Sequence, residues 1–153
     1  MCPPTRKVRI LLYRGRGLVA WLIRWQTRSE YSHAAFLFED GIIYESVYPD
    51  GCVPPRQVTP TDVFTSDCYF FETSGDKYVK LRKWCADHVG CKYDKLAIFR
   101  FIDRHHDHPN DKFFCSEFVE EACEDIEHPL QRCPPWKANP GLLGMSLMIT
   151  KET

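Results

Sequence analysis

A cysteine and a histidine, far apart in the chain, each stand where they could take part in nucleophilic catalysis. Cys115 lies in the segment 113–119 (FFCSEFV), at the predicted start of an amphipathic helix. A helix N-terminus and a neighbouring imidazolium both favour the thiolate, the form of cysteine that attacks carbonyl carbons. His33 stands at the head of an apolar run, 34–38 (AAFLF). The two residues together indicate cysteine-dependent acyl chemistry.

Glu45 is the candidate for orienting His33, as carboxylates do in catalytic triads. Residues 33–47 are typical of a β-hairpin, with apolar runs on either side of 39–41 (EDG). A three-residue loop pairs Ala35 with Glu45 and puts Glu45 on the His33 face, at roughly 7–8 Å between backbones. A two-residue turn would shift the register and send Glu45 to the opposite face. A catalytic role for Glu45 therefore predicts the longer loop.

Cys115 also has a structural interpretation. A cysteine in an apolar helix stripe is usually a core residue, and a single strand histidine is usually structural. The amide of Cys115, in the unpaired first turn of its helix, is one candidate oxyanion donor, and the sequence does not name a second. The predicted inward stripe of this helix consists of Cys115, Phe118, Val119, Ala122, Cys123 and Ile126.

These residues match the pattern of a known family. A histidine heading a SHAAFL strand, a carboxylate twelve positions later at Glu45 and CSEFV opening a late helix resemble the circularly permuted NlpC/P60 (papain-like) superfamily. Within it, the chain is similar to the YiiX/YaeF-like cysteine amidase and peptidase branch. In permuted members the histidine precedes the cysteine, as it does here. More distantly, the chain resembles lecithin:retinol acyltransferase-like enzymes. The resemblance covers most of residues 10–149.

The resemblance implies a single papain-like domain over residues 1–153, with an antiparallel sheet packed against helices. It implies Cys115 as nucleophile, His33 as general base and acid, and Glu45 as the residue that orients His33. The implied activity is hydrolysis of an amide bond, of a peptide, peptidoglycan-type or isopeptide kind, through an acyl-enzyme and without a cofactor. The candidate substrate-binding residues are Ser32, Tyr93 and Ser116.

Two other functions stay open. The apolar segment 18–25 and the acyltransferase-like spacing are compatible with a lipid acyltransferase or thioesterase of the same superfamily. A non-catalytic binding module on this fold is the third interpretation. The presence of Cys115, His33 and Glu45 together counts against it.

The remaining elements must position these residues. Four prolines between 49 and 60 predict a loop, and 18–27 is expected to be a buried helix, with a membrane-surface helix as the alternative. We expect the Cys115 helix to run to about Ile126 with Asn110 or Asp111 as its cap. Strands at both ends with helices between them predict the α+β class. The other expected elements are strands over 7–14, 68–73 and 145–150, and helices over 76–89 and 93–102.

Composition restricts the class of protein. A chain of 153 residues fits one domain, and a net charge of −1 argues against binding nucleic acid through a basic surface. The sequence has no signal-peptide pattern and no apolar stretch near the roughly 18 residues of a membrane span. We therefore expect a cytoplasmic protein, with membrane-surface contact open but not favoured, whose partner is a peptide or other amide-bearing substrate. Its eight cysteines are expected to be free thiols.

Two further clusters have structural explanations. The segment 104–108 (RHHDH) contains metal-ligand types, but neighbouring positions in a loop rarely converge on one ion, so we expect no metal site. The acidic run on the Cys115 helix is expected to be its solvated face. That run comprises Glu117, Glu120, Glu121, Glu124, Asp125 and Glu127.

Overall fold

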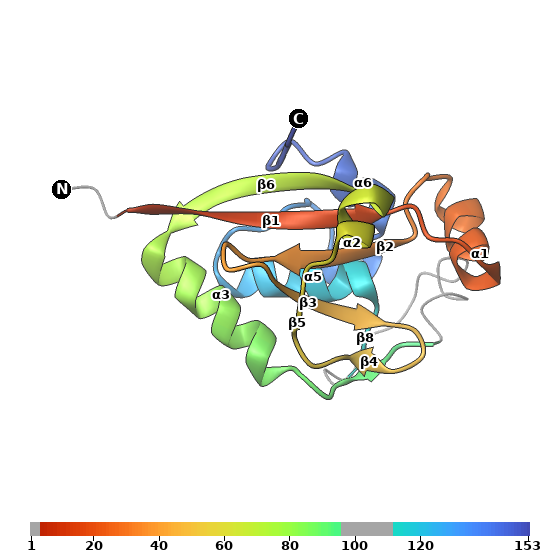
Figure 1. Cartoon of the computed structure of the whole chain (residues 1–153), viewed down its shortest axis with the longest axis horizontal. Helices are drawn as coiled ribbons and strands as arrows, with labels where there is room; N and C mark the ends of the chain where they lie inside the picture. Colours follow the sequence, from red (N-terminus) through yellow and green to blue (C-terminus); the bar gives the residue numbers. More distant parts are fainter. Residues whose placement is uncertain (1–3, 96–111) are drawn as a thin grey trace.

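A seven-stranded antiparallel sheet forms the centre of the molecule (Figure 1). The computed structural model describes residues 4–95 and 112–153. The strand order is β4-β3-β2-β1-β6-β9, with β5 paired to β3. The strands are β1 (Thr5–Tyr13), β2 (His33–Leu37), β3 (Ile42–Val47), β4 (Gly51–Cys52), β5 (Arg56–Gln57), β6 (Ser66–Ser74) and β9 (Thr150–Lys151).

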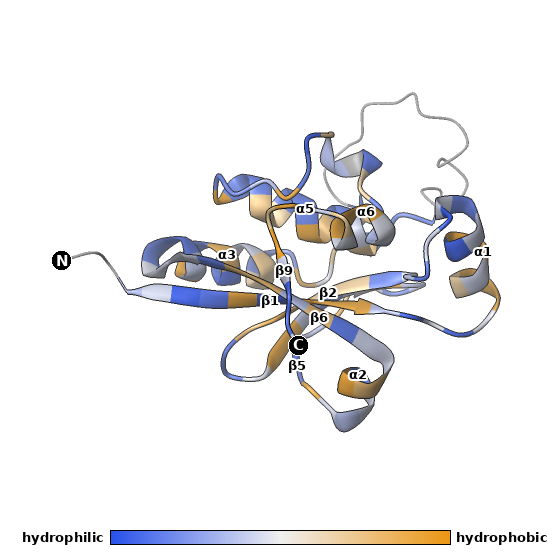
Figure 2. Ribbon diagram, turned by 90° about the horizontal axis from the view of Figure 1, so that it is seen from above, coloured by the Kyte–Doolittle hydropathy of each residue, from blue (hydrophilic) through white to orange (hydrophobic). Residues whose placement is uncertain are grey.

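Helices cover the two faces of this sheet unequally (Figure 2). On one side lie α3 (Gly75–Asp87), α5 (Cys115–Asp125) and α6 (Pro140–Gly144), and on the other lies α2 (Pro60–Thr65). At one end of the sheet is α1 (Leu18–Thr27). A short parallel pair, β7 (Lys92–Tyr93) and β8 (Lys112–Phe113), leads into α5, and a 3₁₀ turn, η1 (Pro135–Lys137), follows it. The chain is a single α+β domain, as its pattern of elements predicts.

Both faces of β2 are buried, which explains why its residues after His33 are all apolar. Phe36 belongs to the larger core and packs against Phe118 of α5, with ring centroids 6.2 Å apart. Ala35 packs with Leu11 and Ile43 on the opposite face. Successive side chains of a strand point to opposite faces of the sheet. The strand β2 therefore packs against α5 on one face and contributes to the smaller core cluster on the other.

The β2–β3 hairpin has the predicted three-residue loop. The Gly41 amide donates to the carbonyl of Phe38 at 3.0 Å, and φ of Gly41 is +79°, the left-handed conformation that closes such loops. Ala35 pairs with Glu45 across the two strands. Glu45 consequently lies on the face of His33, two positions along the ladder.

The helix over 18–27 has its predicted bounds but is not buried. Only Ile23 is buried, whereas Leu18, Trp21 and Trp25 are 80%, 56% and 63% exposed. The helix lies at the end of the sheet and contacts the core along one stripe alone. The sequence of the helix is apolar on most of its surface, and this pattern alone did not show that the helix would lie exposed at the end of the sheet. No helix among the described residues is long and apolar enough to cross a bilayer.

Several predicted boundaries are wrong. The N-cap of α5 is Phe114, not Asn110 or Asp111, because β8 runs directly into the helix. Of the helix predicted over 93–102, Tyr93 belongs instead to strand β7, and positions 96–102, like the 104–108 segment, lie outside the described residues. The last strand is only Thr150–Lys151, since α6 and turns occupy the residues before it. Helix α2, with Thr59 as its cap, was not predicted.

The acidic run on α5 is only partly solvated, contrary to expectation. Glu117 and Glu120 are 8% and 0% exposed. Glu117 accepts a hydrogen bond from the Phe114 amide at 3.2 Å, and Glu120 accepts from the amides of Leu130 and Gln131 at 3.0 and 2.9 Å. Burial raises the pKa of Glu120 to about 7, although these amides oppose the shift. Glu117 thus holds the N-terminus of α5, and Glu120 holds the segment that follows the helix.

Replacing Gly51 by alanine is expected to destabilise the domain near the site. Its φ is +92°, and an added Cβ would lie 2.1 Å from the carbonyl oxygen of Cys91. Gly90 has the same φ but open space around it, so Gly90→Ala measures the backbone strain alone. We expect Gly51→Ala to lower the free energy of unfolding by at least about 2 kcal/mol more than Gly90→Ala does. Urea denaturation of both variants checks this, and equal losses would refute the close packing of β4 on β7.

Candidate active site

His33 and Glu45 form a direct pair on the β2–β3 hairpin. The Nε2 atom of His33 lies 2.7 Å from Oε2 of Glu45. Glu45 is only 5% exposed, so its carboxylate is held largely away from water. The three-residue loop sets this contact, because it places Glu45 opposite Ala35 and diagonal to His33.

Cys115 is the first residue of α5 and is held near the hairpin by the strand before it. The hydroxyl of Ser46, next to Glu45 on β3, donates to the carbonyl of Phe113 at 2.8 Å. Cys115 is 1% exposed and packs with Ile23, Tyr93 and Phe114. The sulfur therefore lies at a helix N-terminus, beneath α1.

The Cys115 thiol lies close enough to the His33 side chain to act on its pKa, so the structure places Cys115, His33 and Glu45 in one cluster. Burial alone would lower the pKa of His33, but the hydrogen bonds to Cys115 and Glu45 outweigh it and raise that pKa to about 10. Burial would also raise the pKa of Glu45, and the His33 and Arg56 cations overcome this and lower it. The imidazole is thus held as a cation between the sulfur and a carboxylate. The sulfur also approaches the Ser32 carbonyl, at 3.9 Å.

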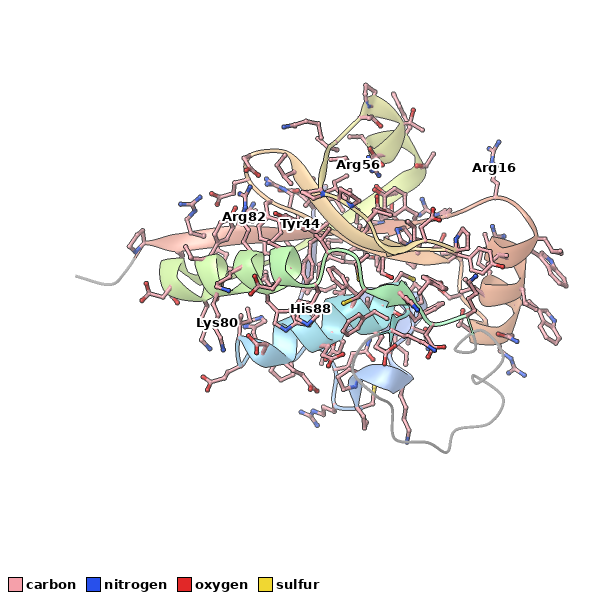
Figure 3. All side chains as sticks on the ribbon, turned by 90° about the horizontal axis from the view of Figure 1, so that it is seen from below. Arg16, Tyr44, Arg56, Lys80, Arg82 and His88 are labelled. Carbon is pink, nitrogen blue, oxygen red and sulfur yellow. The ribbon has the colours of Figure 1, made fainter. Side chains whose placement is uncertain are left out.

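Arg56 and Asp62 extend the pair beyond what the sequence indicated. The Nε atom of Arg56 donates to Oε1 of Glu45 at 2.9 Å, and its two terminal nitrogens donate to Asp62 at 2.8 and 2.9 Å. Asp62 also accepts from the Tyr13 hydroxyl at 2.9 Å and from the Thr59 amide at 2.8 Å. Arg56 lies on the α2 side of the sheet, away from α5 (Figure 3).

These contacts make Arg56 a positioning residue for Glu45. The Arg56 hydrogen bonds, the largest cause, hold the pKa of Asp62 well below its usual range. The two terminal nitrogens of Arg56 are held by Asp62, and this fixes the orientation in which its Nε atom donates to Glu45. The segment 59–62 (TPTD) carries a recognisable capping-box signature, which could have revealed α2. Nothing in the sequence indicated that the helix holds the arginine behind Glu45.

Replacing Arg56 by glutamine is expected to lower kcat by up to about 100-fold with little change in KM, because Glu45 and His33 lose their fixed orientation. Since Arg56 lowers the pKa of Glu45, the acid limb of the pH–rate profile is expected to move to higher pH. Arg82→Gln, which breaks an ion pair to Asp40 in the hairpin loop, is the matched control. A profile for Arg56→Gln that superimposes on the parent profile would contradict this role.

The predicted substrate-binding residues differ in their placement. Tyr93 packs beside Cys115, and burial, its largest influence, raises the pKa of its hydroxyl. The hydroxyl of Ser32 accepts from the Gly15 amide at 2.9 Å and so fixes the loop before α1. Ser116 is fully buried and donates to the Ala138 carbonyl at 2.9 Å. Tyr93 and Ser32 border the sulfur, while the Ser116 hydroxyl is engaged in anchoring α5.

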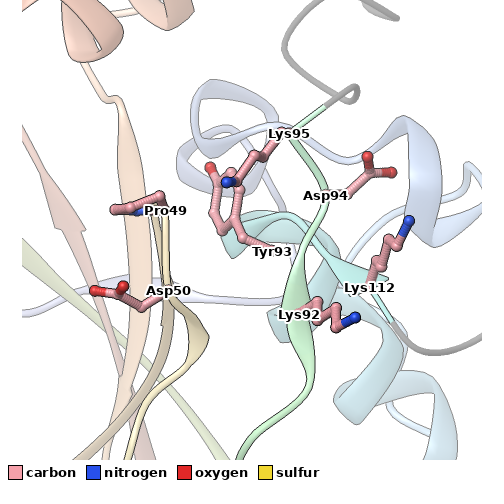
Figure 4. A pocket seen from close by; sticks show the side chains of 7 residues that line it. All are labelled: Pro49, Asp50, Lys92, Tyr93, Asp94, Lys95 and Lys112. Atoms are coloured by element: carbon pink, nitrogen blue, oxygen red, sulfur yellow. The ribbon is translucent and has the colours of Figure 1, made fainter.

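A cavity of about 300 Å³ lies on the outer side of Tyr93 (Figure 4). Tyr93 separates it from the Cys115 cluster, and the Tyr48 ring lies edge-on to Tyr93 with centroids 5.6 Å apart. Three of its lining residues are lysines and two are aspartates. The full lining is Pro49, Asp50, Lys92, Tyr93, Asp94, Lys95 and Lys112.

The described residues, 4–95 and 112–153, contain no group of three His, Cys, Asp or Glu side chains that could hold a metal ion. At the site itself, Nε2 of His33 faces Oε2 of Glu45. The segment 104–108 lies outside the described residues.

Comparison with solved structures shows that this fold occurs elsewhere. The chain is similar to YiiX from Escherichia coli, described as a metalloprotein, with a TM-score of 0.68 and 14% sequence identity. The match covers 97% of this chain and 96% of YiiX. A scan of protein-family models found no match, and a search of curated proteins found no similar sequence. At this identity the similarity concerns the fold.

Proposed function

We propose that the protein is a cysteine hydrolase of the permuted papain-like type, which cleaves an amide bond through an acyl-enzyme on Cys115. The observation that carries the proposal is the chain of contacts from Cys115 through His33 to Glu45, with 2.7 Å between the last two. A cation held between a helix-start sulfur and a buried carboxylate favours the thiolate. The likeness in fold to YiiX is compatible with this assignment.

The reaction follows from these positions. The Cys115 sulfur attacks the substrate carbonyl carbon and forms a C–S bond, and the carbonyl oxygen becomes an oxyanion. The His33 imidazolium gives its proton to the leaving nitrogen as the C–N bond breaks, which leaves a thioester on Cys115. Neutral His33 then takes a proton from water, whose oxygen attacks the thioester. The C–S bond breaks, and the acid product and the starting ion pair are regenerated.

The first turn of α5 supplies one source of oxyanion stabilisation. The amides at a helix start have no partner within the helix, and the Cys115 amide is the nearest of them to the sulfur. The 11-residue helix also adds the positive end of its dipole. Glu45 keeps His33 oriented and stabilises its charged form, while Arg56 holds Glu45 in place.

The cavity of Figure 4 is the proposed entrance for substrate, because Tyr93 lines it and also packs against Cys115. Three lysines and two aspartates line this cavity, so charged or polar groups of a substrate would find partners of either sign there.

No step is assigned to a metal. YiiX is described as a metalloprotein. Among residues 4–95 and 112–153 of this chain, however, no donor set suited to a metal ion is present. The proposed mechanism uses the side chains of Cys115, His33 and Glu45.

Acyl transfer or thioester cleavage on a lipid is the second candidate. The observation that favours it is α1, which covers Cys115 with one face and exposes Trp21 and Trp25 on the other. The chemistry at the sulfur is the same, and the acceptor is a lipid alcohol or amine instead of water.

The test is to trap the acyl-enzyme. The protein is incubated with p-nitrophenyl esters of N-acyl amino acids and of fatty acids, and intact mass and peptide mapping locate the acyl group. We expect a single acyl group, on Cys115, followed by its release. Acylation elsewhere, or no acylation by any ester, would favour a binding module without turnover.

A further inference from the structure

Helix α1 carries two apolar stripes, one packed on the domain and one exposed. Its inner face, with Ile23 buried and Val19 and Leu22 half-buried, packs on the cluster that contains Cys115. Its outer face has no described partner for three large side chains. These are Leu18, Trp21 and Trp25, which are 80%, 56% and 63% exposed.

The three outer side chains form one continuous patch. They occupy positions i, i+3 and i+7, which share one face of a helix. The two indole rings stack on each other, with centroids 6.2 Å apart and planes inclined by 10°. Single exposed apolar residues are common on protein surfaces, but contiguous exposed apolar patches usually mark sites of interaction.

The patch is surrounded by positive charge. Residues 14–28 contain four arginines and no aspartate or glutamate, in a chain whose net charge is −1. Arg14 is paired with Glu30 and Asp67, whereas Arg16, Arg24 and Arg28 form no ion pair with any acidic residue that the structure describes. Arg16 projects outward from the loop before α1 (Figure 3).

We propose that α1 docks on the surface of a bilayer that contains anionic phospholipid. Tryptophan favours the boundary between headgroups and acyl chains, and arginines beside it bind the lipid phosphates. The helix has 10 residues, too few to span a membrane, so it lies in the plane of the surface. Arg16, Arg24 and Arg28, which have no ion pair among the described residues, favour an anionic surface over an uncharged apolar partner.

Docking in this way sets the geometry of the site. A second stripe of the same helix packs against Cys115, so docking of α1 would bring the sulfur near the membrane surface. The proposal does not depend on the proposed hydrolase activity, because membrane binding is measured without turnover.

The test is co-sedimentation with vesicles of phosphatidylcholine alone and of phosphatidylcholine with phosphatidylserine. We expect binding to the anionic vesicles, weakened by 0.5 M NaCl, and a blue shift of tryptophan emission. Trp21→Ala with Trp25→Ala is expected to abolish binding. Arg16→Gln with Arg24→Gln is expected to weaken it by roughly 25-fold, at about fivefold for each arginine. Phe64→Ala is the matched control, because Phe64 is 87% exposed but lies on α2.

Three results would overturn the proposal. These are failure of the parent protein to bind anionic vesicles, equal binding to both kinds of vesicle, and retention of binding by the double tryptophan variant. Sedimentation velocity tests the rival occupant, a second copy of the chain. A dimer that the tryptophan substitutions dissociate would assign the patch to self-association instead. Intact acylation of Cys115 in the vesicle-deficient variants would leave the proposed hydrolase function standing.

Discussion

Replacing Cys115 by alanine is expected to abolish acylation and to lower the rate of ester or amide hydrolysis by about 10⁴-fold or more. The physical reason is that no other described nucleophile stands at a helix start next to an imidazolium held by a carboxylate. The measurement is steady-state turnover of the ester that acylates the parent protein most rapidly, with the acyl adduct followed by intact mass.

Cys133→Ala is the matched control for this prediction. Cys133 is a half-buried thiol that donates to the Gln131 side chain, on the segment after α5. Its removal is expected to leave turnover unchanged within about twofold. If Cys115→Ala retained the parent rate while its far-UV circular dichroism was unaltered, Cys115 would be a core residue and the proposed mechanism would be wrong.

Replacing His33 by glutamine is expected to lower the rate of hydrolysis by about 10³-fold or more and to change its pH dependence. The pKa of His33 is raised to about 10, so the ring keeps its charge from pH 6 to 8 and the parent rate is expected to vary little across that range. Without the imidazolium, no described side chain at the site can give a proton to the leaving group, and the rate is expected to depend more steeply on pH than in the parent.

His88→Gln serves as the control for the pH profile. His88 stacks on Trp84 at the end of α3, with ring centroids 3.7 Å apart, and takes no part in the Cys115 contacts. Its profile is expected to match that of the parent. A parent rate that instead changed steeply around pH 6.5 would show that His33 titrates as an unperturbed histidine, contrary to the ion-pair account.

The hairpin shows how much of the site was predictable from the sequence. The segment 39–41 contains a glycine that adopts φ of +79°, and the strand period of two then fixes Glu45 on the His33 face. The helix start at Cys115 and its inward stripe follow from the 3.6-residue period and are equally local. Local turn chemistry and periodicity were sufficient for these features.

Other parts depend on contacts between segments distant in the chain. Arg56 reaches Glu45 only because β5 pairs with β3, and two-residue strands leave no periodic signal. The buried state of Glu120 depends on amides of residues 130 and 131, after the helix has ended. Helix α1 was predicted with its correct bounds, yet its exposure depends on where the sheet ends, which its own sequence does not specify.

The most direct test of the central claim is competitive alkylation of the parent protein by limiting iodoacetamide at pH 6, with each of the eight cysteines quantified by peptide mass spectrometry. Cys85 and Cys123 are fully buried and show how slowly a thiol reacts when reagent access is limited, as it is at Cys115, which is 1% exposed. His33→Gln shows how much of the Cys115 reactivity depends on the imidazolium. We expect Cys115 to react fastest of all and His33→Gln to remove this advantage. Cys115 reacting as slowly as Cys85 and Cys123, in both proteins, would contradict it.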